Sequence, residues 1–171
     1  MKKLRLLITE DCDRACAGCC NKDWDLDALP KCIDFSPYDV VMLTGGEPLL
    51  YPDEVIRIAK TVREHNRHAQ VILYTAWSAR VLHVLPWLDG VTLTLHDYGD
   101  EGPFKNLQAT LRDLHLVHTP WVLSASMRLN VFKNVKIKDW YIASWWKVQK
   151  DMYWVKDAEL PKGEVFMRCG L

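Results

Sequence analysis

Residues 12–21 read Cys-Asp-Arg-Ala-Cys-Ala-Gly-Cys-Cys-Asn, and they follow a short apolar run, residues 4–8, that predicts a β-strand. Cys12, Cys16 and Cys19 form the pattern C-x3-C-x2-C. Thiols this close in sequence can converge on one soft metal centre if the loop wraps around it. Thiolates favour iron–sulfur clusters, zinc or Cu(I) over hard cations. The stretch therefore predicts a metal-binding loop at the end of the first strand.

Two kinds of centre suit these three thiols. A cubane cluster has four irons, so three thiolates leave one iron open, and an open position distinguishes a reactive metal site from a structural one. The alternative is a structural zinc knuckle, which needs a fourth ligand. Cys20, Cys32 or a histidine are the residues that can provide it.

A second stretch, residues 40–50, helps to decide between the iron–sulfur cluster and the zinc knuckle. It reads Val-Val-Met-Leu-Thr-Gly-Gly-Glu-Pro-Leu-Leu, an apolar strand that ends in a glycine pair, a glutamate and a proline. The cysteine pattern after the first strand, followed by Gly-Gly-Glu-Pro after the second, resembles the radical S-adenosylmethionine (SAM) superfamily. The resemblance covers about residues 4–132. It implies a radical SAM core, with its site at the carboxyl ends of parallel strands.

The resemblance implies the cofactors and their chemistry. Cys12, Cys16 and Cys19 would hold three irons of a [4Fe–4S] cluster, and the amino and carboxylate groups of S-adenosyl-L-methionine would chelate the fourth. An electron entering the cluster breaks a sulfur–carbon bond of SAM and releases a 5′-deoxyadenosyl radical, which abstracts hydrogen from a substrate. The cofactor carries the difficult step, while the protein aims it and excludes competing reactions.

The resemblance also assigns roles to the Gly-Gly-Glu-Pro residues. Gly45 and Gly46 would let the backbone approach the methionine part of SAM with no Cβ in the way. Glu47 is an anion suited to the amino group of SAM, because charge-assisted hydrogen bonds are shorter and stronger than neutral ones. Pro48 would set the bend that leaves the strand. Taken alone, the glycine pair is an ordinary strand-to-helix turn.

Further contacts to SAM are expected on the later strands. In relatives, polar residues after the third strand and on the fourth approach SAM, and here these are Thr75, and Thr94 or His96. Asn130 and its neighbour Arg128, on the fifth strand, are expected to contact SAM or the substrate. The alternatives are a strand-end cap for Thr75, a half-buried strand position for Thr94 and a structural role for His96.

The cysteine loop departs from the common family pattern at Gly18, where many members have an aromatic residue that lies near the adenine. Residues 18–21, with Trp24 after them, are similar to the activating component of anaerobic ribonucleotide reductase. That subgroup usually has Gly-Gly-Asp-Pro, and it lacks a counterpart of residues 133–171. The resemblance implies a flavodoxin- or ferredoxin-like electron donor and, for an activase, a glycyl-radical enzyme as partner.

Composition argues against several other classes of function. Lys plus Arg and Asp plus Glu number 22 each, so no global electrostatic attraction to nucleic acid or membrane is expected. No apolar run approaches the ~20 residues of a membrane span, and the first apolar segment is too short for a signal peptide. Six cysteines without such a signal favour metal-binding or free thiols in a reducing cytosol, so we expect a cytoplasmic protein.

The hydrophobic pattern alternates between strands and helices over residues 4–132. Strands are expected at residues 4–9, 40–43, 71–75, 91–96 and 122–132, helices at 52–65, 79–88 and 106–115, and a helical turn at 23–29. This order is typical of a parallel sheet with right-handed crossovers. We therefore predict an α/β fold, a partial (β/α) barrel of about five to six mostly parallel strands, in a single domain spanning residues 1–171.

The last third of the chain is harder to interpret. A helix is expected at residues 140–148 and short strands at 152–155 and 164–167. Five of the eight tryptophans lie in this third: Trp121, Trp140, Trp145, Trp146 and Trp154. We expect this aromatic-rich extension, residues 133–171, to be a core or lid over the incomplete barrel. The alternative is a docking surface for an acidic or phosphorylated partner. Cys20 is expected to be a small apolar filler, and Cys169 to be uninvolved.

Together these features predict a radical SAM enzyme, in the leading version an activase-like protein that abstracts hydrogen from a protein or small molecule. The alternative enzyme is a stand-alone modifier of a nucleotide, a peptide or another small substrate. The alternative outside enzymes is a cysteine–metal module with a binding or structural role. Gly-Gly-Glu-Pro argues against that module, because a structural metal site has no use for it.

Overall fold

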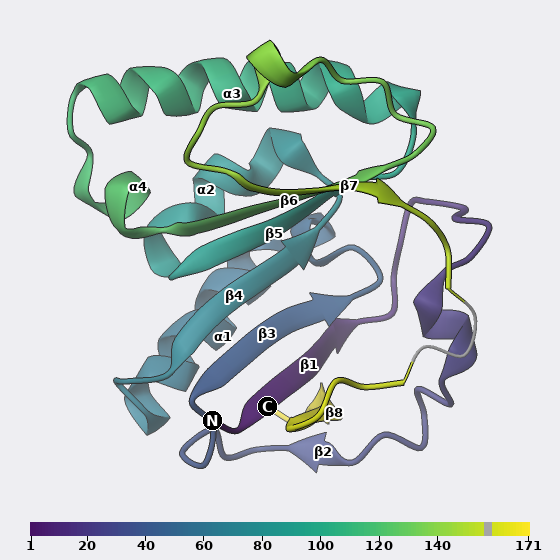
Figure 1. The fold of residues 1–171 in the computed structure, drawn as a ribbon. Coiled ribbons are helices and arrows are strands. Elements are labelled where there is room, and N and C mark those ends of the chain that lie inside the picture. Colours follow the sequence, from purple (N-terminus) through teal and green to yellow (C-terminus); the bar gives the residue numbers. More distant parts are fainter. Residues whose placement is uncertain (156–158) are drawn as a thin grey trace.

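The computed structural model describes residues 1–155 and 159–171, apart from the side chain of Cys20. Its strands form one all-parallel sheet in the order β2-β8-β1-β3-β4-β5-β6-β7 (Figure 1). The sheet is open and consistent with a partial barrel, because β2 and β7 are its two edges. The strands are β1 (Lys3–Thr9), β2 (Lys31–Cys32), β3 (Val40–Gly45), β4 (Gln70–Thr75), β5 (Gly90–Leu95), β6 (Ser126–Phe132), β7 (Lys147–Met152) and β8 (Glu164–Cys169).

In the part of the chain that the structure describes, four α-helices accompany the sheet: α1 (Pro52–His65), α2 (Val81–Val84), α3 (Glu101–Leu116) and α4 (Pro120–Ser124). The strands β1, β3, β4, β5, β6 and β7 lie side by side in chain order. Right-handed crossovers between strands in this order place every connecting helix on the same face of the sheet. Within the described residues, none of the helices is both long and apolar enough to cross a membrane.

The sheet therefore carries its α-helices on one face and no α-helix of the described residues on the other. Leu43, Leu73 and Leu93 are fully buried in the core that the sheet forms with the helices. The residues that follow them in β3, β4 and β5 point to the opposite face, because side chains alternate along a strand. These residues are Thr44 in β3, Tyr74 in β4 and Thr94 in β5, and all three are half-buried. The face with the helices forms the core, and the polar side chains of Thr44, Tyr74 and Thr94 on the opposite face stay partly accessible.

The structure confirms the predicted α/β class and the parallel order of the strands, but the predicted number of strands was too low. Eight strands form the sheet, not five or six. The short β2 and the C-terminal β7 and β8 join it. β7 is an exposed edge strand with the sequence Lys-Val-Gln-Lys-Asp-Met, so it lacks the apolar pattern by which a buried strand is recognised.

Five elements were predicted incorrectly. The strand expected at 152–155 is one of them, because β7 ends at Met152 and residues 153–155 form no strand. Residues 120–124 form α4 and not the start of a strand, because Pro120 is well suited to the first position of a helix. Residues 79–88 break into η3 (Ser78–Arg80), α2 and η4 (Leu85–Trp87). The helix expected at 140–148 is η6 (Asp139–Tyr141) followed by the start of β7. The helical turn expected at 23–29 is replaced by η1 (Cys20–Asp23).

The tryptophans of the C-terminal extension differ in burial. Trp146 is only 5% exposed, packs edge-on against Phe104 of α3 at 5.6 Å and donates a hydrogen bond to Gln108 Oε1 at 2.5 Å. Trp145 stacks on His115, also of α3, with ring centroids 4.0 Å apart. These two residues belong to the core, as the first interpretation of the extension predicts. Trp140, in contrast, is 69% exposed.

Candidate functional site

The carboxyl ends of β1, β3, β4 and β5 surround a hollow, which we call the cysteine pocket. It lies at the edge of the sheet to which the arrowheads of β1, β3 and β4 point in Figure 1. Its lining consists of Cys12, Arg14, Cys16, Cys19, Asn21, Thr44, Gly45, Gly46, Glu47, Tyr74, Thr75, Ala76, Thr94, His96 and Trp154. The structure thus brings together most of the residues that the sequence singled out.

Three of the predicted contacts, Pro48, Arg128 and Asn130, are not among the residues that line the pocket, and Arg128 is exposed. Pro48 is buried and begins η2 (Pro48–Leu50), so it does set the turn that leaves β3. Asn130 lies on β6 and donates a hydrogen bond to Thr94 Oγ1 at 3.4 Å. Asn130 therefore reaches the pocket only through Thr94.

The close packing of two backbone segments requires glycine at positions 45 and 46. A Cβ on Gly45, whose φ is +150°, would lie 2.1 Å from the carbonyl oxygen of Thr9, and a Cβ on Gly46 would lie 2.0 Å from that of Asp11. The backbone N–H of Gly46 donates to Thr9 O at 2.8 Å, and that of Glu47 to Asp11 O at 2.7 Å. The structure shows a close approach of both glycines to the backbone that leads into the cysteine loop, residues 10–21. The expected close approach to SAM stays a prediction.

Glu47 is the buried carboxylate of the pocket, with 2% of its surface exposed. Its Oε1 accepts hydrogen bonds from Leu49 N at 2.9 Å and Thr75 Oγ1 at 2.6 Å, and its Oε2 accepts one from Ala76 N at 3.0 Å. Burial raises the pKa of this carboxyl group, although the three hydrogen bonds oppose the rise. Each carboxylate oxygen can accept about two bonds, so Oε2 retains capacity for one more donor.

A partly buried ion pair holds the middle of the cysteine loop. Arg14, between the first two cysteines, donates through both terminal nitrogens to the carboxylate of Asp100 in η5 (Tyr98–Asp100), and also to Ala76 O at 3.3 Å. Asp100 further accepts hydrogen bonds from the backbone N–H groups of His96 at 2.7 Å and Asp97 at 3.2 Å. The pair thus ties the loop to the ends of β4 and β5.

Asn21 fastens the far end of the loop. Its side-chain amide donates to Gly45 O at 2.8 Å. The loop is therefore attached to the sheet at its start, its middle and its end. Since residues 10–16 form no regular secondary structure, these tertiary contacts determine where the three thiols lie.

His96 follows β5 directly and lies between aromatic rings. Its ring is stacked on Trp154, with centroids 5.0 Å apart and planes within 4°, and is tilted against Phe132 at 4.8 Å. Burial lowers the pKa of His96, and Arg14 lowers it further, while Asp100 and Asp97 act in the opposite direction. Its Nδ1 is buried without a hydrogen-bond partner among the described residues. Burial thus favours the neutral form of the imidazole.

The three thiols are chemically suited to an iron–sulfur cluster. Partial loss of hydration raises the pKa of the Cys16 thiol and also that of the more exposed Cys12 thiol, and Cys19 raises both further. A metal must therefore displace protons to bind there. Among the described residues, no three His, Cys, Asp or Glu side chains are arranged to hold a single metal ion. Cysteine ligands of a cluster bind separate irons, so they need not converge on one point, as the ligands of zinc must.

The size of the cysteine pocket limits what it can hold as it stands. Its volume is about 180 Å³, below the roughly 300 Å³ at which small-molecule sites begin. A second hollow of about 430 Å³ adjoins it and shares Arg14 and Ala76 with it. A cluster and SAM together therefore require the cysteine loop to move outward or the cofactor to extend into the second hollow.

The remaining cysteines lie apart from the pocket as far as the structure describes them. Cys32 is buried in β2 and is the register partner of Cys169 in β8, and neither residue lines the cysteine pocket. Cys32 is thus not placed to be the fourth ligand of a zinc knuckle. The expectation for the side chain of Cys20 lies outside the described part of the chain.

Sequence reasoning missed several residues of the site: Arg14, Thr44, Tyr74, Ala76, Trp154 and, behind Arg14, Asp100. Two of them could have been predicted from the sequence. Thr44 directly precedes Gly45 and Tyr74 directly precedes Thr75, and the alternation of side chains along a strand places Thr44 and Tyr74 on the same face of the sheet as Thr94. No local signal connects Arg14 with Asp100 or Trp154 with the thiols.

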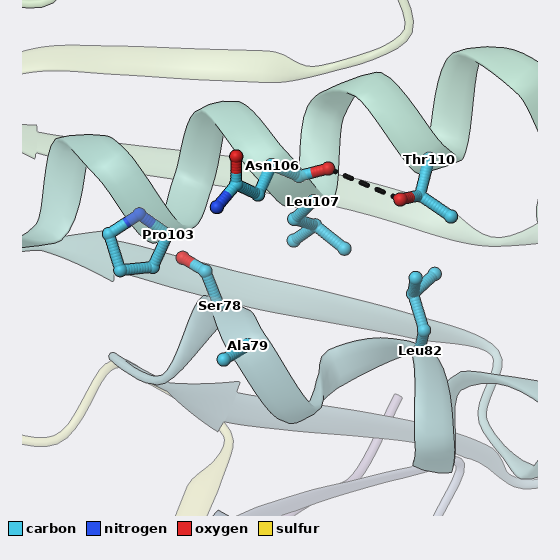
Figure 2. A pocket seen from close by; sticks show the side chains of 7 residues that line it. All are labelled: Ser78, Ala79, Leu82, Pro103, Asn106, Leu107 and Thr110. Carbon is cyan, nitrogen blue, oxygen red and sulfur yellow. Dashed lines mark hydrogen bonds between the residues drawn. The ribbon is translucent and has the colours of Figure 1, made fainter.

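A third hollow, of about 290 Å³, lies between α3 and the segment formed by η3 and α2. Figure 2 shows the side chains of the two segments facing each other across it. Thr110 Oγ1 donates to the carbonyl of Asn106 at 3.3 Å, and the hydroxyl of Ser78 is buried without a partner within the described residues. None of the residues that line this hollow is titratable, so it offers no acid, base or thiolate.

We predict that Gly45→Ala destabilises the protein by about 2–4 kcal/mol, because its Cβ would meet backbone that cannot move freely. Gly102→Ala is the matched control: no atom lies within 4 Å of its Cβ, and alanine favours the helix by about 0.5–1 kcal/mol. Urea unfolding measures both. Equal stability of the two variants would contradict the close approach.

We predict that Asp100→Asn lowers the free energy of unfolding by about 2–3 kcal/mol at pH 7. Burial tends to raise the pKa of Asp100, but the bonds from Arg14, His96 and Asp97 outweigh it and lower that pKa. The ionised Asp100 therefore stabilises the fold fully above about pH 3.9, the pKa of an aspartate in the unfolded chain. This stabilisation is lost as the pH falls from there through the lower pKa of Asp100 in the folded protein.

The measurement is urea unfolding of wild type and variant between pH 7 and pH 3. The difference between them is expected to shrink below about pH 4. Glu54→Gln, which removes a more exposed ion pair with Arg57, is the control and should change stability by less than about 0.5 kcal/mol. A difference that stays constant over this range would contradict the account of Asp100.

No family model matches the chain. No curated protein matches it either. The interpretation of the cysteine pocket therefore depends on its own residues: three thiols on one loop, a buried carboxylate and a glycine pair at the carboxyl ends of parallel strands.

Proposed function

We propose that this chain is a radical SAM enzyme. Its cysteine loop would hold a [4Fe–4S] cluster through Cys12, Cys16 and Cys19, and the turn from Gly45 to Glu47 would bind SAM beside it. The observation that supports this most is that all three thiols line one pocket with Glu47, a residue from a separate strand end. Bound there, the cluster would supply the electron that cleaves SAM into a 5′-deoxyadenosyl radical for hydrogen abstraction.

Glu47 is the residue of the chain best suited to the ammonium group of SAM. Thr75 and Ala76 fix its carboxylate by hydrogen bonds, so it is oriented before any ligand arrives. Its Oε2 has room for another donor, and a charge-assisted bond in a buried site is stronger than one in water. The three existing hydrogen bonds therefore position the carboxylate and leave it able to bind.

The exposure of the loop suits an outside electron donor. Cys12 is solvent-exposed, so a cluster bound through it would lie near the protein surface. A flavodoxin- or ferredoxin-like protein could then approach it directly. Two kinds of enzyme could use this site. One is an activase that acts on a glycyl-radical enzyme, and the other is a stand-alone modifier of a nucleotide, peptide or other small substrate.

The test is anaerobic reconstitution with iron and sulfide, followed by dithionite and SAM, with 5′-deoxyadenosine measured by chromatography. We expect about four irons per chain and release of 5′-deoxyadenosine. Cys12→Ala, Cys16→Ala and Cys19→Ala should each abolish both. Cys169→Ala, which removes a thiol outside the pocket, is the matched control and should retain both.

Two results would contradict the proposal. An intact cluster in Cys16→Ala would show that the ligands are assigned incorrectly. Binding of zinc by the wild type, with no cluster formed under reconstitution, would favour the non-enzymatic metal module.

A further inference from the structure

Trp154 brings the C-terminal extension to the cysteine pocket. It follows β7, more than 130 residues after the thiols in the chain, and lines the pocket with them. Its ring is stacked on His96 and lies 4.5 Å from the ring of Phe132, tilted by 49°. An aromatic residue from the end of the chain is thus held in place at the site.

The cysteine loop makes room for this tryptophan at Gly18. A Cβ on Gly18 would lie 2.5 Å from Trp154 Cβ, 2.6 Å from its Cγ and 2.8 Å from its Cδ2. Any other residue at position 18 would push the indole away. The residue before the third predicted ligand and the tryptophan are therefore fitted to each other.

The burial of Trp154 differs from that of a core tryptophan. Trp146 is 5% exposed and its indole N–H is hydrogen-bonded, whereas Trp154 is 37% exposed although it packs against two rings. A large aromatic surface that remains open at a pocket can take a flat ligand. Stacking on an aromatic side chain is how proteins commonly hold a nucleobase, since every base has a π-face.

We infer that Trp154 stacks on the purine ring of SAM, extending the stack that it forms with His96. This inference rests on the proposed function, which supplies SAM as the ligand. The methionine end of SAM is directed to Glu47 and the cluster, and the adenine end is directed to the aromatic side of the same pocket. Trp154 is then a cofactor-binding residue, and Gly18 is the glycine that leaves space for its indole.

The test measures binding and not turnover. S-adenosylhomocysteine, which carries the purine but has no sulfonium charge and is not cleaved, is titrated calorimetrically into the cluster-loaded protein without reductant. Trp154→Ala should weaken binding about tenfold or more. Trp140→Ala, which removes an exposed tryptophan of the same extension, is the matched control and should bind like the wild type.

Two more variants separate stacking from packing. Trp154→Phe keeps a π-face and should retain most of the affinity, whereas Trp154→Leu is apolar without a π-face and should bind as weakly as Trp154→Ala. Iron content and thermal unfolding verify that each variant is loaded and folded. Gly18→Ala, which displaces the indole, should weaken binding to a similar degree.

The outcomes distinguish the inference from the proposed function. If the wild type binds S-adenosylhomocysteine and Trp154→Leu binds it equally well, the inference fails and the proposed function stands. If the wild type binds neither SAM nor S-adenosylhomocysteine, the proposed function fails and the inference falls with it.

Discussion

The backbone of β3 and the backbone that enters the cysteine loop approach each other so closely that no side chain fits between them. Gly46 N and Glu47 N donate to the carbonyls of Thr9 and Asp11, at 2.8 and 2.7 Å. These bonds extend the pairing of β1 and β3 past the end of the sheet. The loop therefore starts from a fixed point, directly beside the buried carboxylate of Glu47.

The contacts that hold the rest of the loop are ionic and polar. Arg14 is bound to Asp100, and Asn21 to the carbonyl of Gly45. Among the side chains that the structure describes, none from residues 10–21 belongs to the hydrophobic core, so the core does not hold the loop. Specific hydrogen bonds replace it. This arrangement leaves the three thiols at least partly accessible, as the proposed binding of a cluster and SAM would require.

The parts of the fold that sequence reasoning predicted correctly are those with a local signal. The strands β1, β3, β4 and β5 carry apolar residues at their buried positions, in a continuous run in β3 and in alternation in β5. The cysteine spacing and the glycine pair also lie within short stretches. The site at the ends of these strands was predictable because parallel strands bring their carboxyl ends to one edge.

The parts that were missed depend on contacts between distant residues. β7 is polar and exposed, and only its pairing with β6 makes it a strand. Arg14 and Asp100 are 86 residues apart, and nothing near either residue indicates the other. The glycine at position 18 has no explanation within the loop sequence. In the folded chain, Trp154 occupies the space that a side chain at this position would need. Such pairings are properties of the folded chain.

The central claim is that three cysteines hold a cluster with one iron left open for SAM, and electron paramagnetic resonance of the reduced, reconstituted protein tests it most directly. The account predicts the signal of a reduced [4Fe–4S] cluster that changes when SAM is added, because SAM becomes a ligand of the open iron. A cluster signal that is identical with and without saturating SAM would contradict it.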